Sequence, residues 1–150
     1  MKTSDNISLI RRWYREVWKE GKDETISELL APDAVLKGQT GPGVEIHGPK
    51  EFAAFADRIR KAFPDTAIVV EDAFGIDDKV AVRWSATMTH GGDGLGVPAT
   101  GKKVRITGMS IARFADGKIV EGWDNWDRLA MLEQIGAYSP PEAVILAKSA

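Results

Sequence analysis

The spacing of apolar residues changes once along the chain, near Thr66. Before this residue the apolar positions recur at three- and four-residue steps, and after it they alternate with polar positions as far as Trp126. A helix buries residues at a period of 3.6 and a strand at a period of two, so the pattern predicts helices followed by strands. The sequence therefore predicts an α+β fold, a conical barrel in which a curved antiparallel sheet packs on N-terminal helices.

Three helices are predicted in the N-terminal part, over about 4–21, 24–30 and 49–63. Ser4 or Asp5 would cap the first helix, and glycine or proline marks the end of each. The segment 37–48 contains four glycines and one proline and is predicted to be a loop.

The C-terminal part predicts an antiparallel meander and a last helix. The strands are expected over 67–74, 79–89, 103–114 and 118–126, and the helix over 127–135. Asp116-Gly117 is a strong hairpin turn between the last two strands. Leu129, Leu132 and Ile135 are expected on one side of the last helix.

Composition limits the kinds of function that this chain can have. The 150 residues carry a net charge of −2, no cysteine and two histidines, and no apolar run approaches the roughly 20 residues of a membrane span. Nucleic-acid binding and cysteine- or multi-histidine-based metal sites are therefore not expected. We expect a soluble, cytoplasmic protein with one domain over 1–138 and a tail over 139–150.

Two carboxylates lie among tryptophans where the last strand is expected to become a helix, Asp124 and Asp127. Apolar surroundings favour the neutral form of a carboxyl group and can make it a useful proton carrier. Asp127 begins the helix, so helix capping explains it. Asp124 alternates with apolar residues, but Ile119 and Trp123 make the opposite face apolar too, so alternation alone leaves an exposed carboxylate possible.

His90 continues the apolar face of the strand 79–89 and could donate a hydrogen bond to a substrate carbonyl. The alternative is a histidine that is satisfied by the backbone at the end of the strand. Aromatic residues at helical or strand spacing usually pack in the core, although a few could line a site for a flat ring system.

Five stretches resemble the SnoaL-like polyketide cyclases, or ester cyclases, of the nuclear transport factor 2-like superfold. They are Leu29-Leu30-Ala31-Pro32-Asp33, His47-Gly48-Pro49, Leu95-Gly96-Val97-Pro98-Ala99-Thr100-Gly101, Phe114-Ala115-Asp116-Gly117-Lys118-Ile119 and Leu132-Glu133-Gln134-Ile135-Gly136. The resemblance implies a conical α+β barrel, a homodimer, no cofactor, and acid/base chemistry on a hydrophobic carbonyl compound.

The resemblance also implies site residues. Counting back from residues 134–136 places the catalytic aspartate of the family on Asp124. Apart from the resemblance, the strand position of His90 makes it a second catalytic candidate. Trp13, Phe55, Trp84, Ser110 and Trp126 are the substrate-binding residues that we expect. A histidine that can assist in the cyclases is replaced here by Ser110, whose hydroxyl donates a hydrogen bond but cannot carry a proton near neutral pH.

The expected activity is a cofactor-independent, intramolecular aldol-type cyclisation. An isomerase, a dehydratase, an epoxide hydrolase or a non-catalytic domain for a small apolar ligand are the alternatives. Epoxide hydrolysis needs an Asp-Arg-Asp arrangement, and Arg83 and Arg113 alternate away from the face that we expect to point inward.

Overall fold

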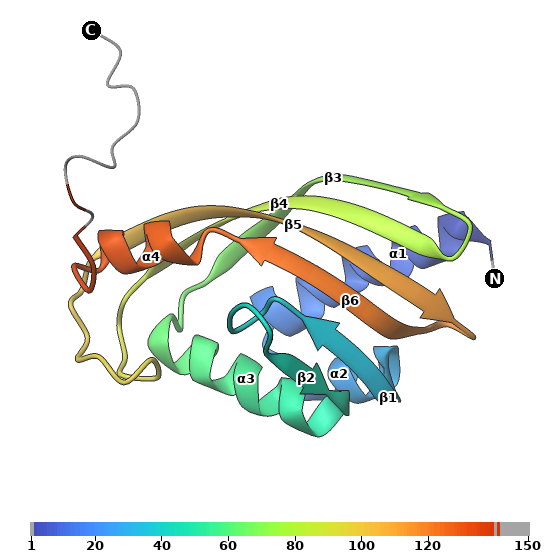
Figure 1. Cartoon of the computed structure of the whole chain (residues 1–150), viewed down its shortest axis with the longest axis horizontal. Coiled ribbons are helices and arrows are strands. Elements are labelled where there is room, and N and C mark those ends of the chain that lie inside the picture. Colours follow the sequence, from blue (N-terminus) through green and yellow to red (C-terminus); the bar gives the residue numbers. More distant parts are fainter. Residues whose placement is uncertain (1, 140, 142–150) are drawn as a thin grey trace, which may run out of the picture.

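A curved sheet with helices on its concave side forms the body of the protein, as the computed structural model of residues 2–139 and 141 shows (Figure 1). The helices are α1 (Thr3–Trp13), which continues as the π-helix η1 (Tyr14–Lys19), α2 (Asp23–Leu29), α3 (Gly48–Ala62) and α4 (Arg128–Gln134). The strands are β1 (Leu30–Lys37), β2 (Glu45–His47), β3 (Ala67–Ile76), β4 (Lys79–Thr89), β5 (Lys103–Ala115) and β6 (Lys118–Trp126). The predicted α+β fold is confirmed.

The six strands have the order β2-β1-β6-β5-β4-β3. The meander from β3 to β6 is the one that the alternation predicted. β1 lies parallel to β6, so the sheet joins the N-terminal half of the chain to the last strand. The helix α1 packs against β3 and β4, and α3 packs against β1 and β2, which closes the cone.

The strands β1 and β2 correct the prediction, which had a helix end near Leu30 and a loop over 37–48 and placed no strand in this region. Pro32 lies within β1, and the pairing of β1 with β6 is irregular between Leu30 and Val35. Proline has no N–H to donate, so such an irregularity is where a strand can contain it. The partner of β1 is almost ninety residues away, and local sequence patterns carry no signal for such pairing.

The helices also differ in detail from their predicted ends. The first begins at Thr3 with Lys2 as its N-cap, so neither Ser4 nor Asp5 is the capping residue. At the last helix, Asp127 is the predicted cap, and its Oδ1 accepts a hydrogen bond from the backbone N–H of Ala130 at 3.0 Å.

The buried side of α4 matches the predicted one except at Leu129, which is 51% exposed. Ile135, the C-cap residue, is buried, and Leu132 is half-buried against the core. Met131, which the prediction did not include, is also buried.

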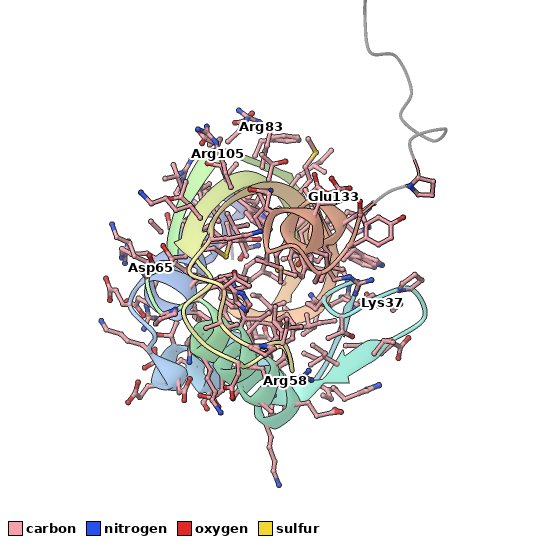
Figure 2. All side chains as sticks on the ribbon, turned by 90° about the vertical axis from the view of Figure 1, so that its left-hand side faces the viewer. Lys37, Arg58, Asp65, Arg83, Arg105 and Glu133 are labelled. Carbon is pink, nitrogen blue, oxygen red and sulfur yellow. The ribbon has the colours of Figure 1, made fainter. Side chains whose placement is uncertain are left out.

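The two faces of the sheet differ in what they contact. Alternate residues of β4 from Val80 to Met88 are buried against the helices, as predicted. The opposite, convex face has no helix over it in the described part of the chain, and Arg83 and Arg105 point outward from it (Figure 2).

No helix among the described residues is long and apolar enough to cross a membrane. The predicted tail over 139–150 lies almost entirely outside the described residues. Its boundary and the cytoplasmic location stay predictions.

Candidate active site

Asp124 occupies an inward position on β6, directly opposite Ser110 on β5. The hydroxyl of Ser110 donates a hydrogen bond to Oδ1 of Asp124. Burial raises the pKa of Asp124 to about 6, and the hydrogen bond from Ser110 lowers it, so burial is the larger effect. No ion pair within residues 2–139 involves Asp124. An aspartate in this state is present in both protonation forms near neutral pH.

Ser110 connects Asp124 to two further side chains. The hydroxyl of Tyr14 donates to Oγ of Ser110 at 3.0 Å, and Nε1 of Trp84 donates to the same oxygen at 3.4 Å. A serine hydroxyl has one proton to donate and two lone pairs to accept with, so these three bonds use its full capacity. The protons of Tyr14 and Trp84 therefore point to Oγ of Ser110, and the proton of Ser110 points to Asp124.

Tyr14 reaches this network because of the π-helix at the end of α1. η1 begins at Tyr14, and both Tyr14 and Trp18 line the cavity described below. Short π-helical turns are frequent at functional sites because they change the direction of a side chain without ending the helix. Burial, and then the charge of Asp124, raise the pKa of Tyr14, so its hydroxyl stays protonated and remains a donor.

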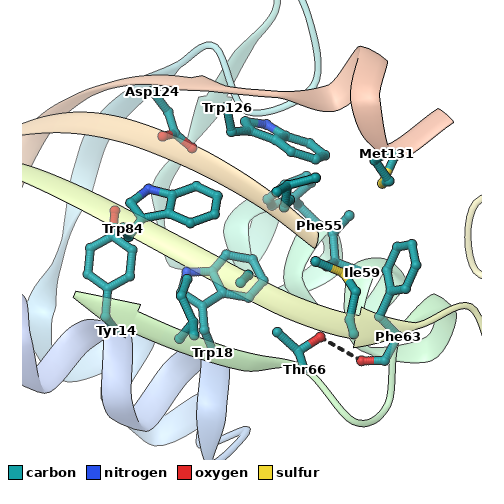
Figure 3. A pocket seen from close by; sticks show the side chains of 14 residues that line it. Tyr14, Trp18, Phe55, Ile59, Phe63, Thr66, Trp84, Asp124, Trp126 and Met131 are labelled. Carbon is teal, nitrogen blue, oxygen red and sulfur yellow. Dashed lines mark hydrogen bonds between the residues drawn. The ribbon is translucent and has the colours of Figure 1, made fainter. Parts of the chain in front are cut away.

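A hydrophobic cavity opens beside Asp124 (Figure 3). Asp124, Trp84 and Tyr14 lie at one end of it, and Phe63 and Met131 lie at the other. Most of its walls are aromatic or aliphatic, as is usual for small-molecule sites.

Few polar groups interrupt this first cavity. Thr66 lines it, but its hydroxyl donates to the backbone oxygen of Phe63 at 2.8 Å and is thus already used. Within the described part of the chain, the lining residues include no lysine or arginine. Asp124 is therefore the lining group that can exchange a proton with a ligand near neutral pH, and Tyr14 and the indoles that line the cavity carry hydrogen-bond donors.

A second cavity also adjoins Asp124. The two cavities share three lining residues, which are Tyr14, Trp18 and Asp124. The carboxylate thus lies at the boundary between them.

The predicted substrate-binding residues all line one of these two cavities. Phe55, Trp84 and Trp126 line the first, and Trp13 and Ser110 line the second. The structure therefore brings them together around Asp124, while their contact with a substrate stays a prediction.

His90 lies elsewhere. It is fully buried at the end of β4 and lines neither cavity. Its Nδ1 lies 3.0 Å from Oγ1 of Thr100 and accepts from the backbone N–H of Thr100 at 3.3 Å, and its ring packs 5.5 Å from that of Phe63. The contacts of Nδ1 support the alternative reading of a histidine held at the strand-loop junction, although Nε2 has no hydrogen-bond partner among the described residues. Its catalytic role stays a prediction.

Sequence reasoning missed two residues of the site. The helical spacing of Tyr14 predicts a core aromatic residue. The signal for its second role is its hydroxyl, because a buried tyrosine hydroxyl usually has a hydrogen-bond partner. Gln39, which lines the second cavity, lies in the segment read as a loop, and no local signal could have identified it.

The arginines considered for epoxide hydrolysis do not reach either cavity. Arg83 is exposed on the convex face, and Nε of Arg113 pairs with Glu121 at 3.0 Å. Within residues 2–139, no group of three His, Cys, Asp or Glu side chains is arranged to hold a metal ion.

Together these features define a class of protein: a small conical α+β domain whose hydrophobic interior holds a desolvated carboxyl group on its last strand. Comparison with known proteins narrows the class. The chain belongs to the SnoaL-like polyketide cyclase family, whose pattern it matches over residues 8–135. The family resemblance seen in the sequence is confirmed.

Individual relatives agree with this assignment. The aklanonic acid methyl ester cyclase DauD of Streptomyces sp. (strain C5) is 28% identical over 134 residues, covering 89% of this chain and 83% of DauD. A solved structure named as a SnoaL-like polyketide cyclase, from Jannaschia sp. CCS1, has a TM-score of 0.82 at 25% identity, covering 92% of this chain and 95% of that one. IdmH of Streptomyces antibioticus has a TM-score of 0.73 at 32% identity, covering 91% and 99%.

Proposed function

We propose that this protein closes a carbon ring in a hydrophobic, carbonyl-rich substrate by an aldol-type addition, with Asp124 as the proton carrier. The observation that carries the proposal is a desolvated carboxyl group, with a pKa of about 6, at the wall of a hydrophobic cavity. A carboxylate whose pKa is near the working pH is both a usable base and a usable acid.

The reaction would need only one proton carrier. Asp124 takes a proton from a carbon that lies between two carbonyl groups, which leaves an enolate. The enolate carbon attacks a ketone carbon of the same molecule, so a carbon–carbon bond forms and the ketone becomes an alkoxide. The alkoxide then takes the proton back from Asp124. The cavity contributes by holding the two reacting carbons close together.

Ser110 and Tyr14 would respond to the protonation of Asp124. When Asp124 is protonated it can donate to Oγ of Ser110, whose own proton then turns toward the oxygen of Tyr14. The indole of Trp84 is only a donor and keeps its place on the second lone pair of Ser110. The Tyr14 proton is thereby released toward the cavity, where it can stabilise the enolate oxygen at the moment when that charge forms.

The substrate that we propose is a neutral polyketide ester. DauD and a further relative, DnrD of Streptomyces peucetius, are named as cyclases of aklanonic acid methyl ester. The first cavity offers no lysine or arginine among its described lining residues, and a free carboxylate would be costly to bury there. An ester of similar shape avoids that cost.

Aklanonic acid methyl ester is therefore the first compound to test. We expect the wild-type protein to convert it to a cyclised product and Asp124→Asn to lower kcat/KM by about 10²–10⁴-fold, the usual contribution of a positioned acid/base. Asp127→Asn is the matched control, because Asp127 only caps α4. Chromatography with mass spectrometry would follow the product.

A rate that is unchanged in Asp124→Asn would contradict the mechanism. A product of unchanged ring count would instead favour an isomerase or a dehydratase, which could use the same first proton transfer. Binding without any conversion would favour the ligand-binding alternative. The hydrogen bond from Ser110 to Asp124 supports an enzyme, since it orients the carboxylate at the cavity.

The homodimer implied by the family resemblance is also a proposal. Phe74, Met109 and Ile111 are exposed apolar residues on the convex face, where a second copy of the chain could cover them. Sedimentation velocity of the purified protein would give the oligomeric state.

A further inference from the structure

The second cavity has a polar residue to which the proposed reaction assigns no role. Its lining includes Gln39, Ser110 and Asp124 together with apolar residues such as Leu36 and Phe52. Ser110 and Asp124 bond to each other and take part in the proposed reaction. The reaction leaves the side chain of Gln39 unexplained.

The side chain of Gln39 is buried without a hydrogen-bond partner. The residue is 8% exposed, and its Oε1 has no partner among the described residues. Its backbone oxygen is occupied, because it accepts from Nε1 of Trp126 at 3.0 Å. A buried amide oxygen without a donor is unfavourable, and such groups in folded proteins usually have a reason.

The backbone beside Gln39 is shaped to hold it next to Asp124. Gly38 has a φ of +90°, and a Cβ at this position would lie 1.9 Å from the backbone oxygen of Asp124. Only glycine permits so close an approach. The segment after β1 is therefore pressed against the strand that carries the proposed proton carrier, and Gln39 follows directly.

We propose that the second cavity binds a hydroxyl-bearing ring of the substrate, with Oε1 of Gln39 as the acceptor of the hydroxyl proton. The inference rests on the proposed function for one point, which is that the same molecule extends past Asp124 into the first cavity. The shared residues Tyr14, Trp18 and Asp124 make this possible, because a fused-ring compound can occupy both spaces with its reacting carbon at their boundary. Gln39 would then set which end of the substrate enters which cavity.

A matched pair of small aromatic probes tests the acceptor directly. 2-Naphthol carries a hydroxyl proton, and 2-methoxynaphthalene has the same ring but no proton to donate. We expect isothermal titration calorimetry to show that the wild-type protein binds 2-naphthol about tenfold more tightly than the methyl ether, the effect of one buried hydrogen bond.

Gln39→Leu should abolish this preference, because it should weaken the binding of 2-naphthol and leave that of 2-methoxynaphthalene unchanged. Gln39→Met, which is apolar and as long as glutamine, provides a second variant if Gln39→Leu does not fold. Asp124→Asn is the matched control and should keep the tenfold preference, although the proposed function predicts that it loses turnover.

Equal binding of the two probes by the wild-type protein would overturn the proposal. So would a preference that survives in both Gln39 variants or that disappears in Asp124→Asn, since the acceptor would then be Asp124. Because the measurement involves no turnover, it separates a failure of this proposal from a failure of the proposed reaction.

Discussion

Asp124 and His90 are both titratable residues at inward positions, on the two strands that flank β5, yet their surroundings differ. Asp124 borders two cavities and uses only Oδ1 for hydrogen bonding to described residues. His90 has an equally unpartnered atom among the described residues, Nε2, but it lines neither of the two cavities. Burial therefore produces a candidate reactive group only where open space lets a ligand reach the free atom.

The contacts of His90 are structural and hold the loop that follows β4. Its backbone N–H donates to the oxygen of Lys102, and its backbone oxygen accepts from the N–H of Gly101, both at 2.9 Å. Its ring bonds Thr100 and packs on Phe63. The backbone and the side chain of His90 together hold the C-terminal end of the loop over 91–101 against the end of β4.

The largest effect that we predict is the loss of stability when the side chain of His90 is removed. His90→Ala should lower the free energy of unfolding by about 3–5 kcal/mol, because it leaves a cavity against Phe63 and removes the partner of Thr100. Chemical denaturation measures the loss. The kcat/KM of the protein that remains folded should change less than threefold.

His90→Asn is the matched variant, since an asparagine oxygen can take the place of Nδ1 and accept from Thr100. It should recover part of the lost stability. A large fall in kcat/KM in a stably folded His90→Asn would make His90 catalytic after all and would remove the contrast with Asp124.

The same contrast explains what the sequence could predict. Alternation identified the inward face of β4, because it depends only on neighbouring residues, but it left the inward face of β6 undecided. It could not separate Asp124 from His90, because what distinguishes them is a cavity built by residues such as Tyr14 and Phe63 from distant elements. The bond from Tyr14 to Ser110 spans 96 positions in the chain. Only the family resemblance favoured Asp124 as the catalytic residue over other titratable residues at inward positions.

The next effect concerns the cost of keeping Asp124 desolvated. Its pKa rises from 3.8 to about 6 on folding, so the folded state disfavours the charged form. The protein should lose about 3 kcal/mol of stability from this group as the pH rises from 3.8 to 6. Asp124→Asn should therefore be up to about 3 kcal/mol more stable than the wild type at pH 8.

Near pH 2.5 the difference should vanish, because the carboxyl group is then neutral in both the folded and the unfolded chain. Urea denaturation at the two pH values measures it. If Asp124→Asn is less stable than the wild type at pH 8, the carboxylate stabilises the fold, as we expect of His90. Its desolvation would then carry no net cost.

The smallest effect tests how the hydrogen-bond network sets the working pH. The base form of Asp124 is needed first, so kcat/KM should rise with pH through a pKa of about 6. Ser110→Ala should move this midpoint upward by about one unit, since the hydrogen bond from Ser110 lowers the pKa and bonds to charged groups are worth about 1.5–3 kcal/mol. Tyr14→Phe is the control and should move it less, because Tyr14 reaches Asp124 only through Ser110. A midpoint that stays in place in Ser110→Ala would mean that burial alone sets the pKa of Asp124. The hydrogen bond from Ser110 would then be structural, like the hydrogen bonds between Thr100 and His90.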